Sequence, residues 1–194
     1  MLKRRVLPLL ALAALLASCA SPDPKLYALA TVPGPAQGGG PRVIVLRTVG
    51  LARYLERPQI VLSSEQYRLN VSSNDWWGEP LGAMLGRTLI AELAQRLPGS
   101  GVFSETGAIA VDPDMRAEVN IQRMDTDSSG TLILDAQIAV SPTRGRQDVR
   151  TRTLHIAVPP PSPGVTGQVA ATSIAIGQLA DALAALLRGA RPAA

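Results

Sequence analysis

The chain has 194 residues, of which 19 are lysine or arginine, 15 are aspartate or glutamate and only 3% are aromatic. Lys3, Arg4 and Arg5 supply three of the positive charges, so the rest of the chain is nearly neutral, with 16 basic residues against 15 acidic ones. A nucleic-acid-binding domain is excluded, because it would carry a basic stripe and stacking aromatic side chains. The single cysteine excludes disulfides within the chain and thiolate metal sites, and the length suits one domain.

The N-terminus has the order of a signal peptide. The basic residues are followed by an apolar stretch, residues 6–17, which is too short to cross a bilayer. Small residues then lead to the only cysteine, and the run Leu16-Ala17-Ser18-Cys19 resembles the bacterial lipobox. We therefore predict that residues 1–18 are a lipoprotein signal peptide and that Cys19 is lipidated. The alternative is an ordinary secretory signal that is cleaved at a nearby small-residue site.

The predicted lipid anchor attaches the mature protein to a membrane. A lipobox cysteine carries diacylglycerol and its new amine is acylated, and two or more acyl chains make the attachment effectively permanent. Ala20 rather than aspartate follows the cysteine, which favours the periplasmic face of the outer membrane, with the inner membrane as the alternative. Residues 19–41 are predicted to be a lipidated tether, since the Gly/Pro run at 33–41 is typical of a flexible loop.

Six segments beyond the tether have the alternating or β-branched apolar residues of strands. They are 42–49, 60–62, 67–71, 117–121, 132–140 and 154–158. The second and third read as a hairpin, and the turn residues between the last three indicate that these strands are antiparallel neighbours.

Two segments have the period of amphipathic helices. After Pro80 leucine recurs every four residues until Pro98-Gly99 ends the pattern, and Glu92 is expected on the exposed face of this helix. A Pro-rich connection then leads to a second, long helix over 169–187, and residues 189–194 are predicted to be a frayed tail. The predicted fold is a single α+β domain, residues 42–188, in which a mainly antiparallel sheet carries both helices on one face.

Catalytic and metal-binding groups are scarce in the sequence. His155 is the only histidine and is interpreted as a solvated residue of a strand. The run Asp125–Gly130 matches the first half of a calcium loop, but Ala136 stands where a bidentate glutamate is needed, so a hairpin turn is favoured. No serine, cysteine or lysine has the context of a nucleophile with its base. The sequence therefore predicts no catalytic residue, no metal and no cofactor, and a protein that is not an enzyme.

A local basic cluster precedes and enters the last predicted strand. Its members are Arg144, Arg146, Arg150 and Arg152. A solvated strand end is the first interpretation, and a surface that meets anionic lipid headgroups or an acidic partner is the alternative.

Three segments, in this order after the lipobox, carry a family resemblance. They are Tyr27-Ala28-Leu29, the stretch Tyr54–Val61, and Trp77–Leu81 with the Leu-rich helix that follows. Together they look like the ABC-type transport auxiliary lipoproteins, the PqiC-like family, over nearly the whole mature chain. Trp76 is a mild departure, because one tryptophan rather than two is expected at this place.

The resemblance implies a non-enzymatic subunit of a lipid transporter. Members of the family accompany an MCE-domain protein and an ABC permease and ATPase that move lipid between the inner and outer membranes. The resemblance thus implies that this protein docks the periplasmic MCE component at the outer membrane. Tyr54, Arg57, Pro58 and Trp77 are the candidate partner-binding residues, with roles in the core and in turns as the alternative.

Two other classes of function remain open at this stage. A plug or chaperone of an outer-membrane β-barrel would have the same anchor and the same kind of compact domain. A lipid-modifying hydrolase is disfavoured, because the sequence offers no nucleophile with its base. The sequence does not decide between a monomer and a homo-oligomer.

Overall fold

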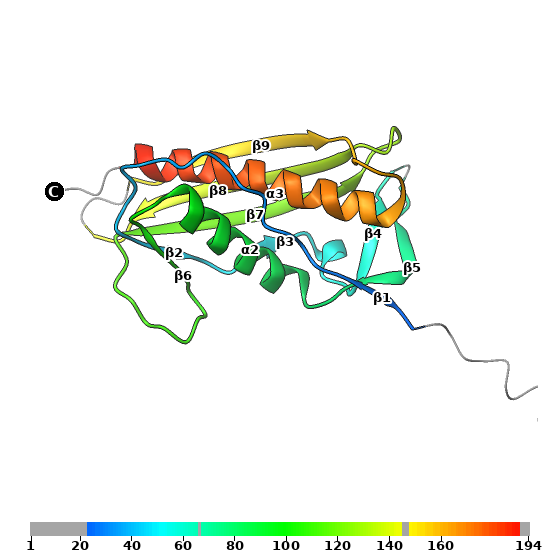
Figure 1. Cartoon of the computed structure of the whole chain (residues 1–194), viewed down its shortest axis with the longest axis horizontal. Helices are drawn as coiled ribbons and strands as arrows, with labels where there is room; N and C mark the ends of the chain where they lie inside the picture. The colour runs from blue at the N-terminus through cyan, green and yellow to red at the C-terminus, as the bar shows by residue number, and fades with distance from the viewer. Residues whose placement is uncertain (1–22, 66, 145–147, 191–194) are drawn as a thin grey trace, which may run out of the picture.

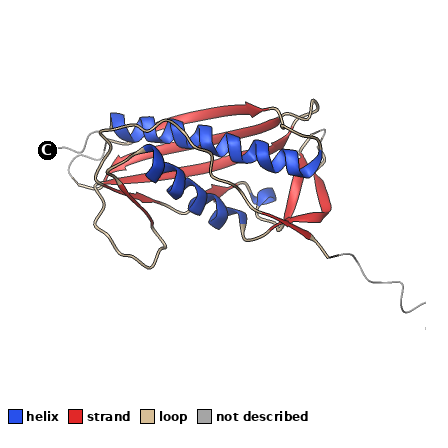
Figure 2. Cartoon of the chain, in the orientation of Figure 1, coloured by secondary structure: helices blue, strands red, loops and turns tan. Residues whose placement is uncertain are grey.

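The structure is a computed structural model, and it describes residues 23–65, 67–144 and 148–190. These residues form nine strands in one sheet, a short 3-10 helix and two long helices that cover one face of the sheet (Figures 1 and 2). The elements are β1 (Lys25–Tyr27), β2 (Val43–Leu46), β3 (Gly50–Leu51), η1 (Arg53–Leu55), β4 (Gln59–Ser63), β5 (Asn70–Trp77), α2 (Leu81–Arg96), β6 (Gly101–Ser104), β7 (Met115–Thr126), β8 (Leu132–Pro142), β9 (Arg150–Val158) and α3 (Gly164–Gly189). The predicted α+β class is confirmed.

Strand β7 is the centre of the sheet. One edge of β7 pairs antiparallel with β8, which pairs antiparallel with β9. The other edge pairs in parallel with β2, then β3, then β4, so these short strands follow one another along it. β6 extends the sheet beside β2, while β5 and then β1 extend it beside β4. In the described chain β3 has no strand on its outer side, which leaves a gap in the sheet edge between β6 and β5.

The long strands follow the predicted alternation. In β7 the side chains of Met115, Ala117 and Val119 are buried, while Arg116 and Glu118 between them are partly exposed. The predicted antiparallel pairing of β7, β8 and β9 is confirmed. The parallel pairings of β1, β2, β3 and β6 could not be read from the sequence, because their partners lie far away in the chain and no turn residue marks them.

Helix α2 has the predicted position and apolar face. It begins directly after Pro80, where the missing N–H of proline costs nothing, and its final turn is closed by the Leu97 N–H, which donates to the Leu93 carbonyl at 2.8 Å. Leu85, Leu89 and Leu93 are fully buried. The four-residue leucine period therefore marks the face that packs on the sheet.

Helix α3 is long and apolar enough to cross a membrane, with a mean hydropathy of 1.6 over its most apolar window. However, 61% of that window is buried inside the domain, which makes α3 its core helix. Gly167 is required in the first turn, because a Cβ there would collide with the Ser162 carbonyl. The helix includes Gly189, and Ala190 is buried. The rest of the predicted frayed tail, 191–194, lies outside the described residues.

Between β1 and β2 the chain crosses the outer side of both helices (Figure 1). We call residues 28–41 the strap. The Ala30 N–H donates to the Ser173 hydroxyl of α3 at 3.2 Å, and the Gln37 N–H donates to the carbonyl of Arg96 in α2 at 2.5 Å. Much of the segment that the sequence predicts to be a tether thus lies against the domain. The predicted signal peptide and Cys19 lie outside the described residues.

An ion cluster is buried where the strap meets α2 and α3. Glu92 and Arg96 are each 1% exposed, and the Arg96 Nε donates to the Asp181 carboxylate at 2.6 Å. The Glu92 carboxylate accepts the Val32 N–H of the strap at 2.9 Å. The prediction that Glu92 is exposed is therefore wrong. The helix face that carries Glu92 is polar, as the sequence indicates, but the strap covers it.

The strap can approach the ion cluster closely only because Gly34 lacks a side chain. A Cβ at Gly34 would lie 2.4 Å from the Arg96 guanidinium. The same guanidinium donates to the Val32 and Gly177 carbonyls, each at 3.1 Å. Glycine at this position thus lets the chain contribute backbone acceptors to a charge that would otherwise be costly to bury.

Candidate functional site

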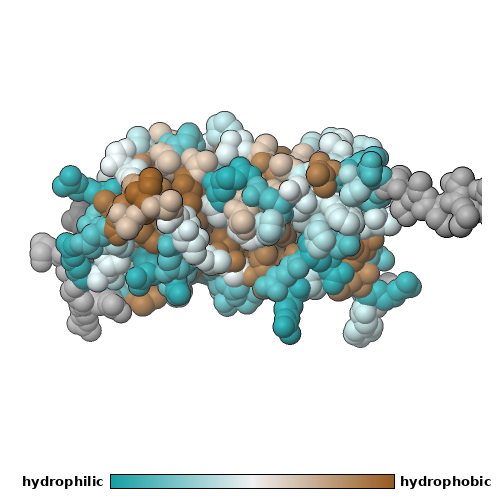
Figure 3. All heavy atoms as spheres, turned by 90° about the horizontal axis from the view of Figure 1, so that it is seen from below, coloured by the Kyte–Doolittle hydropathy of each residue, from teal (hydrophilic) through white to brown (hydrophobic). Residues whose placement is uncertain are grey.

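An open apolar groove of about 1060 Å³ lies beside the gap in the sheet edge. Its floor is formed by Leu46, Val49 and Leu51, from the chain that runs along β7. Helix α2 forms one wall, and the segment between η1 and β4 lies across from it. Figure 3, which views the molecule from the side of β6 and α2 in Figure 1, shows hydrophobic surface exposed between hydrophilic side chains. Such a groove, with an apolar floor and a polar rim, suits a macromolecular partner.

The α2 wall is made of small residues. Gly82, Ala83 and Gly86 line the groove and are followed along the helix by Ile90. A Cβ at Gly82 would meet the Val49 carbonyl at 3.6 Å, whereas a Cβ at Gly86 would meet nothing within 4 Å. Gly82 therefore packs closely against the sheet edge, whereas Gly86 does not. The rest of the face is free to receive a partner.

Three of the four candidate partner-binding residues line this groove. They are Arg57, Pro58 and Trp77. The Trp77 side chain is 7% exposed. The backbone N–H of Trp77 donates to the Pro58 carbonyl at 2.7 Å, and this bond joins the end of β5 to the segment before β4. The Arg57 Nε donates to the Tyr54 carbonyl at 2.9 Å, which holds the stem of the arginine at the groove.

Tyr54, the fourth candidate, points into the protein and does not line the groove. Its hydroxyl donates to the Asp125 carboxylate at 2.7 Å, and Asp125 is fully buried. The other carboxylate oxygen of Asp125 accepts the Arg123 Nε at 3.0 Å. Burial, followed by the hydrogen bond to Asp125, raises the pKa of Tyr54 well above its usual range. Tyr54 therefore positions η1, and with it Arg57, rather than offering a contact surface.

The half-match to a calcium loop forms the turn between β7 and β8, which confirms the hairpin interpretation. The Asp127 carboxylate accepts the Ser129 hydroxyl at 2.7 Å and the Thr131 N–H at 3.0 Å. The hydrogen bond from the Ser129 hydroxyl lowers the pKa of Asp127. Within the part of the chain that the structure describes, no group of three His, Cys, Asp or Glu side chains could hold a metal ion.

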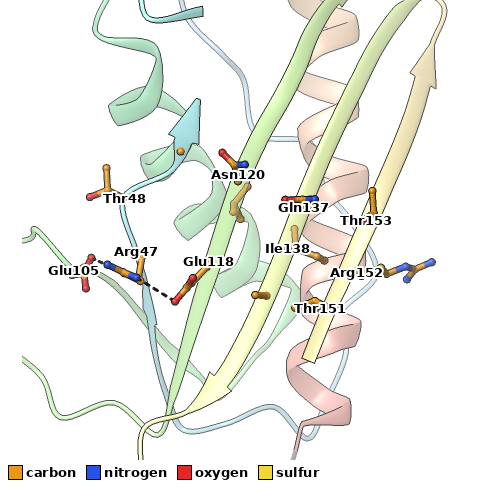
Figure 4. Close-up of a pocket in the computed structure, with 13 residues that line it drawn as sticks. Arg47, Thr48, Glu105, Glu118, Asn120, Gln137, Ile138, Thr151, Arg152 and Thr153 are labelled. Atoms are coloured by element: carbon orange, nitrogen blue, oxygen red, sulfur yellow. Dashed lines mark hydrogen bonds and ion pairs between the residues drawn. The ribbon is translucent and has the colours of Figure 1, made fainter. Parts of the chain in front are cut away.

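A second hollow, of about 580 Å³, lies on the face of the sheet that the helices leave open (Figure 4). Arg47 lies between Glu105 and Glu118, at 3.3 and 3.4 Å, and the neighbouring lining is polar. The ion pairs that Arg47 makes with Glu105 and Glu118 are exposed, and such pairs contribute little energy. The apolar groove is the better candidate for a functional site.

The other charged groups noted in the sequence lie apart from the groove. The exposed His155 has its Nδ1 2.6 Å from the Asp135 carboxylate on the neighbouring strand. Arg144 contacts the Asp112 carboxylate, and the Arg150 guanidinium donates to the Gly189 carbonyl at 2.6 Å. In Figure 4 the Arg152 side chain points past the edge of β9, away from Arg47. Arg146, the remaining member of the predicted basic cluster, lies outside the described residues.

Residues 27–184 match the family described as ABC-type transport auxiliary lipoprotein component. The chain belongs to this family. Membership confirms the resemblance found in the sequence, and it makes this auxiliary lipoprotein a membrane-anchored component associated with an ABC transport system. None of the curated proteins compared with it matched.

Solved structures with the same fold support the architecture of this auxiliary lipoprotein. A Xanthomonas campestris protein of the DUF330 family is similar with a TM-score of 0.70 and 19% identity, over 85% of this chain and 96% of that one. An uncharacterized protein is similar with a TM-score of 0.71 and 17% identity, over 85% of this chain and 99% of that one. At these identities the likeness concerns the fold.

The sequence did not reveal the small-residue wall of the groove. Gly82 and Gly86 lie beside the leucine stripe of α2 and Ala83 lies across from it, at positions where a helix of a soluble protein often carries longer or polar residues. The small size of these three residues was the feature of the sequence that could have indicated the groove wall. The floor could not be found, because it depends on the parallel placement of β2 and β3 along β7.

Proposed function

We propose that this protein is a non-enzymatic lipoprotein subunit of an MCE/ABC-type intermembrane lipid transport system. In this proposal its groove docks the periplasmic MCE component at the outer membrane. The observation that carries the proposal is that the exposed apolar groove is lined by Arg57, Pro58 and Trp77, which belong to the segments that bear the family resemblance. Family membership supports the association with an ABC transporter.

The composition of the groove suits binding of a protein segment. Its apolar floor and small-residue wall let a partner backbone approach closely, and apolar surface removed from water stabilises the complex by about 25 cal/mol per Å². The half-buried Arg57 and the exposed Glu79–Arg87 pair lie at the groove. Buried aromatic and arginine anchors surrounded by polar groups are typical of energetic hot spots.

The lipid on Cys19 makes a modest interface sufficient. An anchored domain is confined to a thin layer at the membrane, which raises its effective concentration for a partner that reaches that layer. The residue after the cysteine, Ala20, supports placement at the outer membrane. The protein would thereby hold the far end of the MCE component near that membrane.

Site-specific photocrosslinking in cells tests this proposal. A benzoylphenylalanine at Ala83, in the groove wall, should crosslink to the MCE component, and mass spectrometry identifies the product. The same residue at Gln137, which is exposed on the opposite face of the sheet, is the matched control and should not give that product. Crosslinks from Ala83 to a β-barrel would favour the plug or chaperone instead, and equal crosslinking from both positions would contradict a role for the groove.

A further inference from the structure

Exposed large hydrophobic side chains gather at one end of the domain. Among the described residues five such side chains are exposed, and three of them, Leu26, Tyr67 and Leu69, belong to β1 or to the turn before β5. The other two, Ile109 and Val149, belong to the loops before β7 and β9. Leu26 lies beside Trp76 near the last residue of β5, whereas Tyr67 and Leu69 lie in the turn before its first residue, Asn70. Single exposed hydrophobic residues are normal on a protein surface, so the placement of two of them in one turn is what needs a cause.

Tyr67 stands at the tip of the turn between β4 and β5. The Arg68 N–H donates to the Glu65 carbonyl at 3.0 Å, and the two strands are joined at the base of the turn by the Asn70 amide, which donates to the Ser63 hydroxyl at 2.7 Å. Tyr67 has a φ of 63°, in the left-handed region that an aromatic residue rarely adopts, and its side chain is fully exposed. The turn thus presents the ring to the surroundings instead of packing it on the protein.

The lipid anchor enters the fold at this same end. β1 pairs with β5, and Figure 1 shows β4 and β5 running across the end of the molecule where β1 begins. Cys19 precedes Lys25 by six residues, so even a fully extended chain holds the cysteine within about 22 Å of β1. β1 therefore stays near the membrane, and β5 runs from its pairing with β1 to the turn that carries Tyr67 and Leu69 across this same end of the molecule.

We propose that this end of the domain rests on the membrane and that Tyr67 and Leu69 enter its interfacial region. The occupant of this exposed apolar surface is the bilayer that holds the lipid of Cys19, so the inference depends on the lipid anchor in the proposed function. A tyrosine has an apolar ring and a polar hydroxyl, the combination that is enriched where headgroups meet hydrocarbon. The contact fixes the orientation of the domain, which a lipid anchor alone would not do.

Spin labels on the full-length lipidated protein test the contact. Because the only natural cysteine carries the lipid, Tyr67→Cys introduces the single free thiol, and Ile109→Cys does so at a matched exposed position in the loop after β6. Each labelled protein is reconstituted into phosphatidylethanolamine–phosphatidylglycerol vesicles. Collision with oxygen, which partitions into the bilayer, is compared with collision with a water-soluble nickel chelate.

We expect the oxygen-to-nickel collision ratio to rise on reconstitution for the label at 67 and to stay unchanged for the label at 109. Equal ratios at the two positions would overturn the proposal. So would a label at 67 that is already immobilised in detergent, because its surface would then be covered by a second copy of the chain. Circular dichroism melting of each variant checks that the domain is folded. Neither spin-label result depends on the groove. The Ala83 crosslink to the MCE component can therefore be absent while the membrane contact is observed, and it can be present while the membrane contact is not.

Discussion

The two helices share one face of the sheet, yet they differ in what they leave exposed. α3 is apolar along most of its length and is buried against the sheet, α2 and the strap. α2 buries a leucine face, carries Glu92 and Arg96 under the strap, and leaves Gly82, Ala83 and Gly86 in the wall of the groove. Hydropathy alone would favour α3 as the functional, membrane-related helix. Burial shows instead that α3 holds the fold together and that α2 is the helix available to a partner.

Substitutions in the leucine face of α2 should cause the largest loss of stability. Leu89→Asp places an uncompensated charge against the sheet, and we expect it to cost about 4 kcal/mol or more of the free energy of unfolding. Ala91→Asp adds the same charge on an exposed position of the same helix and should cost less than about 1 kcal/mol. Urea denaturation measures both. Similar losses for the two variants would mean that the face of α2 is misassigned.

The second largest effect should come from the polar face that the strap covers. Arg96→Met removes the cation beside Glu92 and leaves a buried carboxylate unpaired, so we expect a loss of about 3 kcal/mol. Arg87→Met removes an exposed partner of Glu79 from the same helix and should cost at most about 1 kcal/mol. Thermal unfolding of the two variants measures both losses. An unchanged melting temperature for Arg96→Met would contradict the burial of the ion cluster.

Glu92 should also give the domain a pH-dependent stability. Burial raises the pKa of Glu92 above its usual 4.5, which means that the folded protein binds this proton more tightly than the unfolded chain does. Stability is therefore greatest below the unfolded pKa and falls as the pH rises through the raised folded pKa. Glu92→Gln should flatten the decline in melting temperature that begins as the pH rises above the usual glutamate pKa of 4.5. A decline of equal slope in this variant would assign the dependence to another group.

The smallest effect on stability is expected in the groove. Arg57→Glu leaves the core untouched and should change the free energy of unfolding by about 0.5 kcal/mol. We expect the same variant to weaken binding of the MCE component, measured by pull-down from membranes. Gln137→Glu, on the open face of the sheet, adds a negative charge away from the groove and should bind normally. Arg57→Glu protein that fails to fold would instead assign this arginine a structural role.

The sequence was sufficient for features that repeat along a single element. The leucine period gave the position of α2, the alternation gave the three long antiparallel strands, and Asp127 with its neighbours gave the turn between β7 and β8. Features that join distant segments were not accessible. Glu92 looked exposed because nothing in α2 indicates that the strap lies on it, and Tyr54 looked like a surface aromatic because its partner, Asp125, lies 71 residues away.

The strap also determines how a pull on the lipid anchor would reach the domain. Tension from Cys19 would enter through β1, whose parallel pairing with β5 would be loaded in shear along the strands rather than opened one bond at a time. Beyond β1 the strap runs over α3 and α2 and is held by Ser173 and Arg96. The strap and the two helices beneath it would therefore be loaded only after β1 had sheared from β5, so that the short β1–β5 pairing shields the core from traction between a membrane and a bound partner.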